Sequence, residues 1–143
     1  MMDHKKMAIA RLREYESMCA AVENLRLQIR LLRQRQASVS AIQTDRVVVS
    51  AGNNTPDQWL VESIAQLQQL EMSLERTMHW LRVTDGALEI LNPEELRILR
   101  MFYIKKEPRA LETLCRLLEV EKSSVYRRRD KALQKFMRGL YGV

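Results

Sequence analysis

Apolar residues recur along this chain at the spacing of amphipathic helices. Within residues 4–38 one apolar stripe steps by three and four residues in turn, through Tyr15, Met18, Val22, Leu25, Ile29 and Leu32. A second stripe runs through residues 56–84 and consists of Leu60, Ile64, Leu67, Leu70, Leu74, Met78 and Leu81. A stripe of this kind needs a partner helix to cover it. We therefore predict that the two segments pair as a long antiparallel helical hairpin.

The ends of these two helices are marked by residues that favour turns and caps. Residues 39–55 break the apolar period and contain Gly52, Asn53 and Asn54, so we predict a loop, whose conformation and role stay open. Thr55 is suited to cap the second helix and Pro56 to open it. Asp85 and Gly86 follow the second stripe and indicate that this helix ends or kinks near residue 84.

Three shorter amphipathic segments follow, at about residues 93–104, 110–118 and 122–138. The first is preceded by Asn92, a favourable N-cap, and opens with Pro93, Glu94 and Glu95. The apolar sides of the three segments are Leu96, Leu99, Phe102 and Tyr103, then Leu111, Leu114, Cys115 and Leu118, then Val125, Ala132, Leu133 and Phe136. The chain is therefore predicted to be all-α, with a helical hairpin at 1–90 and a three-helix unit at 91–143.

The connection between the last two segments is short, as in two helices joined by a tight turn. Its residues are Leu118, Glu119 and Val120, and we expect Val120 to point inward and fix the angle between the helices. Glu119 stands where glycine would relieve a left-handed backbone, at a cost of at most about 1 kcal/mol. Two short helices joined in this way, the second one basic, have the plan of a helix-turn-helix.

Charge is unevenly divided along the chain. The net charge is +6, and residues 92–143 hold 13 Lys/Arg against 7 Asp/Glu, whereas residues 1–91 are neutral. A basic module beside a neutral one favours a polyanion-binding end and a scaffold end. Within the first helix Arg26, Arg30 and Arg33 share a second face, which we interpret as solvated in preference to a second nucleic-acid patch.

Several classes of function are disfavoured by composition. Cys19 and Cys115 are the only cysteines and lie on apolar stripes, which is typical of buried thiols in a reducing cytoplasm. The sequence lacks a signal-peptide pattern and any apolar run of about 18 residues, so no membrane association is expected. It also lacks a metal-spaced His/Cys set, a glycine-rich phosphate loop and a Cys–His nucleophile pair. We therefore expect no enzyme activity, no cofactor and no metal.

The candidate site lies on residues 122–131, opposite the apolar side of the last segment. Arg127 is suited to bidentate contact with guanine, and Tyr126 offers a hydroxyl and a ring to a thymine methyl group or a phosphate. Lys122 and Ser123 share this side, and Ser123 and Ser124 are suited to bind bases or phosphate near the helix start. The remaining cations, Arg128, Arg129 and Lys131, are expected to neutralise phosphates. The stem of Arg129 borders the apolar side and is expected to be partly buried.

At these residues the sequence resembles a known family. The segments LNPEELRILRMFY, ALETLCRLLEV and EKSSVYRRRDKALQKF make Leu91 to Gly142 similar to the promoter-binding region 4 of bacterial sigma-70-type factors. The layout of the whole chain resembles small phage or prophage transcriptional regulators, among them late-operon activators related to the autolysin regulatory protein. The resemblance implies base-reading positions at Lys122, Ser123 and Arg127. It also implies backbone contacts at Tyr126 and Lys131, with Arg116 nearby.

The sequence-level expectation is thus a cytoplasmic regulator that binds double-stranded DNA, with the hairpin mediating homodimerisation or contact with RNA polymerase. No segment resembles the sigma region that melts promoter DNA. Two alternatives stay open: a phage DNA-packaging subunit of the small-terminase kind, which would form a large ring, and a helical adaptor that binds only protein. The operator sequence, and the choice between activation and repression, do not follow from the residues.

Overall fold

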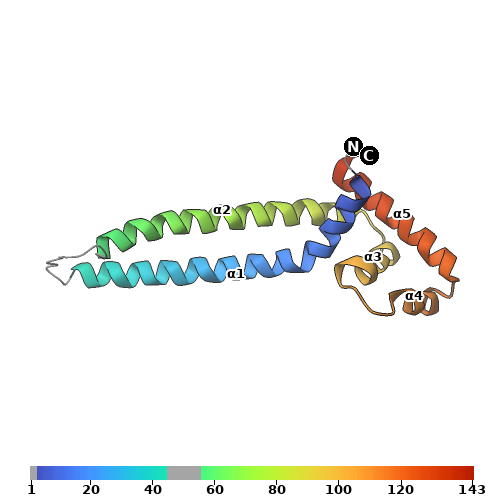
Figure 1. The fold of residues 1–143 in the computed structure, drawn as a ribbon, viewed down its shortest axis with the longest axis horizontal. Coiled ribbons are helices and arrows are strands. Elements are labelled where there is room, and N and C mark those ends of the chain that lie inside the picture. Colours follow the sequence, from blue (N-terminus) through green and yellow to red (C-terminus); the bar gives the residue numbers. More distant parts are fainter. Residues whose placement is uncertain (1–2, 45–55) are drawn as a thin grey trace. The chain divides into compact units, whose positions relative to one another are not determined.

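The computed structural model describes residues 3–44 and 56–143, and within them it contains five α-helices and no strand. The predicted all-α fold is therefore confirmed. The helices are α1 (His4–Thr44), α2 (Pro56–Glu89), α3 (Pro93–Leu99), α4 (Ala110–Leu118) and α5 (Lys122–Tyr141). A π-helical turn, η1 (Arg100–Ile104), follows α3 without a break (Figure 1).

The helix ends agree with the sequence prediction at some positions and differ at others. Helix α4 has the predicted bounds, whereas α1 continues past residue 38 to Thr44 and α5 continues past residue 138 to Tyr141. The predicted end of the second helix at residue 84 is wrong, because α2 runs through Gly86 to Glu89. One interior glycine costs a helix only about 1 kcal/mol, and burial of Ala87 and Leu88 offsets this cost. Residues 45–55 lie outside the described residues. They include most of the predicted loop and Thr55, the predicted cap of the second helix.

The chain divides into two compact units. Unit 1 comprises residues 1–19 and 79–143, and unit 2 comprises residues 20–78. This division differs from the predicted boundary between residues 90 and 91. The reason lies in unit 1, where the first turns of α1 and the last turns of α2 contribute to the same hydrophobic core as α3 and α5.

Unit 2 is an antiparallel pair formed by parts of α1 and α2. Arg26 reaches the sulfur of Met78, and Arg33 forms an ion pair with Glu71, so the numbering rises along one helix as it falls along the other. The predicted α2 stripe needs one correction, because Ile64 is exposed and Ser63 is buried in its place. The Ser63 hydroxyl donates to the carbonyl of Leu60 at 2.8 Å and accepts from the Gln36 side chain at 3.0 Å.

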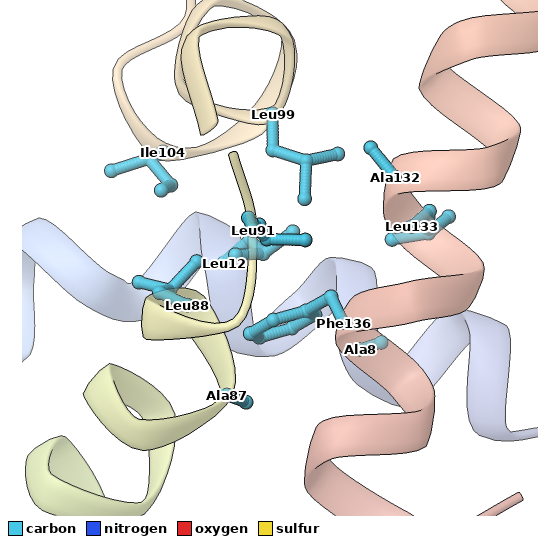
Figure 2. Close-up of a cluster of buried hydrophobic side chains, with 10 residues drawn as sticks. All are labelled: Ala8, Leu12, Ala87, Leu88, Leu91, Leu99, Ile104, Ala132, Leu133 and Phe136. Atoms are coloured by element: carbon cyan, nitrogen blue, oxygen red, sulfur yellow. The ribbon is translucent and has the colours of Figure 1, made fainter. Parts of the chain in front are cut away.

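The core of unit 1 is assembled from five segments of the chain. Figure 2 shows its buried side chains, which come from α1, the end of α2, the α2–α3 connection, the α3–η1 helix and α5. They are Ala8, Leu12, Ala87, Leu88, Leu91, Leu99, Ile104, Ala132, Leu133 and Phe136. The predicted inward positions Ala132, Leu133 and Phe136 are confirmed. Phe136 is fully buried, so the second half of α5 anchors the helix in this core.

Polar contacts and one close approach hold the outer elements of unit 1. Arg11 donates to the hydroxyl of Thr84 at 2.7 Å, and the phenol of Tyr15 donates to the carboxylate of Asp85. Gly139 lies inside α5, where an added Cβ would come within 2.8 Å of the Ile90 side chain. The absence of a side chain there lets α5 approach the end of α2. Gly142, with φ 72°, then closes α5 in the left-handed conformation.

Candidate nucleic-acid interface

Helices α4 and α5 are joined by a tight turn whose geometry follows from one strained residue. Glu119 has φ 55° and ψ 46°, and it is the only non-glycine residue with positive φ in the described part of the chain. The N–H groups of Glu119 and Val120 both donate to the carbonyl of Cys115, which ends α4 in a Schellman-type cap. The predicted left-handed turn at Glu119 is therefore confirmed.

A small hydrophobic core beneath this turn fixes α4 against α5. Its buried members are Ile98, Met101, Ala110, Leu114 and Val125. Val120 and Cys115 pack against it and are only partly buried. Val125 is fully buried in the first turns of α5, so the opposite side of those turns must face outward. The core thus orients the first turns of α5 without burying any of the four residues predicted to contact bases.

The four residues predicted to contact bases lie together on that outward side. Lys122, Ser123, Tyr126 and Arg127 are all exposed. Residues spaced by three and four positions are neighbours on a helix surface, so the four form one continuous patch over the first two turns of α5. The guanidinium of Arg127 lies 3.5 Å from the hydroxyl of Ser124, a contact long enough to leave it available to a ligand. We call these four residues the contact patch.

The residues predicted to contact phosphates separate into two groups. Arg116 and Lys131 are exposed, and no ion pair of either is found in the described part of the chain. Arg128 differs, because its guanidinium lies 2.6 Å from the carboxylate of Glu94 at the start of α3. Arg129 is also largely engaged within the protein, and Ser124 is only half-exposed. Of the four cations predicted to contact phosphates, Arg116 and Lys131 thus stay exposed, whereas Arg128 and Arg129 are engaged within the protein.

Arg129 is held between two aromatic rings. Its guanidinium carbon lies 5.2 Å from the ring centre of Phe102, on η1, and 4.9 Å from that of Tyr126. Its Nε is buried without a hydrogen-bond partner, and one terminal nitrogen lies 3.3 Å from Asp130. Cation–π contact with both rings accounts for this burial. Arg129 therefore supports the ring of Tyr126, a residue of the contact patch, from behind.

A pair of acids at the start of α3 connects that helix to α5, which the sequence prediction missed. The predicted N-cap Asn92 forms a capping box with Glu95, with distances of 2.8 and 2.9 Å between side chains and backbone N–H groups. Glu95 also accepts from the ammonium group of Lys135 at 3.0 Å. Lys135 lies two turns further along the same face of α5 than Arg128, which pairs with Glu94. The sequence signal was two adjacent acids and two cations seven residues apart, and only the fold brings them together.

Electrostatics show that Glu95 is charged in this arrangement. Burial of its carboxyl group would raise the pKa, but the N–H of Asn92 and the ammonium group of Lys135 outweigh that effect and lower the pKa of Glu95. The carboxylate therefore stabilises both the start of α3 and the contact with α5 at neutral pH. The ion pairs Arg128–Glu94 and Lys135–Glu95 connect α5 to α3, and the contact patch stays exposed.

Other kinds of site find little support in the described residues. No group of three or more His, Cys, Asp or Glu side chains among them is arranged to hold a metal ion. Cys19 and Cys115 are free and only half-buried, in contrast to the predicted full burial. None of the helices in the described ranges is long and apolar enough to cross a membrane.

Comparison of the chain with protein-family models, with curated proteins and with solved structures finds no match. The features that bear on function are therefore those of geometry and charge. They are the contact patch, the turn that orients it, and the exposed cations Arg116 on α4 and Lys131 on α5.

Proposed function

We propose that this protein is a sequence-specific DNA-binding transcription regulator that inserts the first half of α5 into the major groove. The observation that carries the proposal is the contact patch, in which four polar or charged side chains share the outward face of a helix fixed by a tight turn. An α-helix fits the major groove of double-stranded DNA, where each base pair presents a distinct pattern of donors and acceptors. The patch offers donors and a ring at that position.

Each contact residue has a role that follows from its chemistry. Arg127 would contact guanine through two parallel hydrogen bonds, with Lys122 and Ser123 reaching neighbouring bases near the helix start. Tyr126, supported by Arg129, would contact a thymine methyl group or a phosphate. Arg116 and Lys131 would neutralise phosphates, which adds affinity without sequence information. We assign Arg128 and Arg129 to positioning instead, because their guanidinium groups are already engaged by Glu94 and by the two rings.

The similarity of Leu91 to Gly142 to sigma region 4 extends this proposal. It favours a phage or prophage regulator that acts on promoters in the cytoplasm, with RNA polymerase as a second partner. The basic balance of residues 92–143 supports a polyanion as the primary ligand.

The proposal is tested with the full chain and a random-sequence DNA selection, followed by titrations of the selected duplex and of its single-base variants. Arg127→Ala should lose about 1–3 kcal/mol of discrimination at one base position. Lys131→Ala should weaken binding to all sequences alike and should lower the salt dependence by about one phosphate contact.

Lys5→Ala is the matched control, because it also removes one exposed cation from unit 1. Lys5 lies in the first turn of α1, and the ring of neighbouring His4 is 5.0 Å from that of Tyr141, at the end of α5 far from the contact patch. This variant should bind DNA as the parent does. Absence of DNA affinity at low salt, or an equal effect of Arg127→Ala and Lys131→Ala on every sequence, would contradict the proposal.

A further inference from the structure

The two helices of unit 2 leave their own apolar seam partly open. Among the residues of this unit whose burial the structure describes, only Val22, Ile29 and Ser63 are buried. Most other seam residues are half-buried, namely Leu25, Leu32, Leu60, Leu67, Leu70 and Leu74. Two helices cover only one side of each other, and helical bundles close such a seam with further helices. An additional helical partner is therefore needed to bury it.

The two helices also carry opposite charge within unit 2. Residues 20–44 of α1 contain four arginines and one glutamate, whereas residues 56–78 of α2 contain four acids and one arginine. The α1 segment thus has a net charge of +3 and the α2 segment has −3. A surface that displays both segments side by side is complementary in charge to a second copy of itself. The second copy must be oriented so that its α1 segment faces the α2 segment of the first copy.

One edge of unit 2 displays both helices in this way. A groove of about 440 Å³ has Ile29 and Leu74 among its lining residues, and its α1 rim is formed by Arg26, Arg30 and Arg33. Across it, Arg33 pairs with Glu71 at 2.5 Å.

Two further α2 residues share this edge with Glu71. Glu75 is exposed and lies one turn further along α2 on the same face. Ile64 lies two turns before Glu71 on that face, with 52% of its surface exposed. The edge thus combines a basic rim, an acidic rim and exposed apolar surface, and we call it the charged edge.

We propose that the occupant of the charged edge is a second copy of this chain. A two-fold axis along the helices places α1 of each copy on α2 of the other, so that Arg30 faces Glu71 and Glu75 of the second copy. Ile64 and the apolar groove are then covered. A two-fold axis perpendicular to the helices would instead place the arginines of one copy opposite those of the other. Electrostatic complementarity therefore favours the axis parallel to the helices. This inference stands independently of the proposed DNA binding.

The test measures the mass of the full chain by light scattering and sedimentation over a range of concentrations. The parent should be a dimer. Arg30→Glu and Glu75→Arg should each weaken the dimer by roughly tenfold or more, because like charges then meet across the interface. An equimolar mixture of the two variants should form a heterodimer, since both of its interfacial contacts then join opposite charges.

Arg76→Glu is the matched control, because it reverses a charge one residue away from Glu75. This position is turned by about 100° around α2 and leaves the charged edge, so the variant should stay dimeric. Circular dichroism should show all three variants to be as helical as the parent, since each altered side chain is exposed.

A parent chain that is monomeric at every concentration would overturn the inference, and so would a larger ring or a dimer that both charge reversals leave intact. Titration with the selected DNA duplex keeps the two proposals apart. A monomer that still binds DNA refutes only the proposed dimer, whereas a dimer without DNA affinity refutes only the proposed function.

Discussion

A single strained residue, Glu119, sets the angle between α4 and α5. Glu119 holds a left-handed conformation that most non-glycine residues avoid, at a cost of about 1 kcal/mol. The conformation persists because Val120, the next residue, is fixed in the core under the turn and its N–H completes the cap on α4. The strained backbone at Glu119 thus orients the contact patch.

Replacing this residue should therefore stabilise the protein. We expect Glu119→Gly to raise the free energy of unfolding by about 0.5–1 kcal/mol, since relief of the left-handed strain exceeds the added entropy of the unfolded chain. Urea denaturation measures the difference. Glu121→Gly is the control, because Glu121 has an ordinary φ of −77° and should gain nothing. Equal stabilisation by both variants would show that the strain at Glu119 has no energetic consequence.

At the scale of elements, η1 explains which side of the α3–η1 helix is buried. A π-helical turn adds a residue to the turn, and the N–H of Lys105 accordingly donates to the carbonyl of Arg100 at 2.8 Å. Leu99 and Ile104, five residues apart, can then enter one core, while Met101 enters the other. The predicted apolar residues all pack on a core, Leu99 fully buried and Leu96, Phe102 and Tyr103 partly buried. The prediction omitted Met101 and Ile104, because a regular helical period does not contain this extra residue.

The contact between α3 and α5 should depend on pH through Glu95. Its pKa is lower in the folded protein than the ordinary value of about 4.3, so its carboxylate stabilises the fold above that pH. This contribution is lost as the pH falls through the folded value. Glu95→Gln should therefore be less stable than the parent near neutral pH, by about 0.5–1 kcal/mol, and the difference should shrink at acidic pH, as the pH falls through the folded pKa.

Urea denaturation at the two pH values checks this expectation. Glu107→Gln serves as the control, because Glu107 is an exposed acid of the same unit, located between η1 and α4, and should show no such pH-dependent difference. A Glu95→Gln difference that stays constant with pH would contradict the assignment of a charged, hydrogen-bonded carboxylate.

For the molecule as a whole, the central observation is that residues distant in sequence complete the unit that carries the contact patch. Leu12 is fully buried beside Phe136 and Leu99 in the core drawn in Figure 2. A fragment that begins at residue 92 would lack Ala8, Leu12, Ala87 and Leu88 and would expose this core. Experiments on the contact patch therefore need the full chain.

Truncation of the Leu12 side chain should destabilise unit 1, although Leu12 lies far along the chain from the contact patch. We expect Leu12→Ala to lower the free energy of unfolding by about 2–5 kcal/mol and to weaken the proposed DNA binding in proportion to the unfolded fraction. Leu31→Ala makes the same chemical change at a site that is 54% exposed and should cost little. Thermal denaturation distinguishes the two, and similar losses in both variants would contradict this role of the amino-terminal turns.

The sequence by itself determined the features that depend on neighbouring residues. Apolar periodicity located all five described helices, and residue types that favour caps and turns located the N-cap Asn92 and the turn at Glu119. Caps, turns and helical faces are set within a few residues. The exposure of Lys122, Ser123, Tyr126 and Arg127 followed from the same periodicity, since Val125 and Ala132 had to face inward.

Only the tertiary structure decided which distant segments meet. It placed Leu12 in the core of unit 1, engaged Arg128 with Glu94, and set Arg129 between Phe102 and Tyr126. These contacts depend on the path of the whole chain, and a periodic pattern shows that a residue is buried or charged without showing its partner. For that reason the sequence could not show that Arg128 and Arg129, two of the cations expected on phosphates, contact other side chains of the protein.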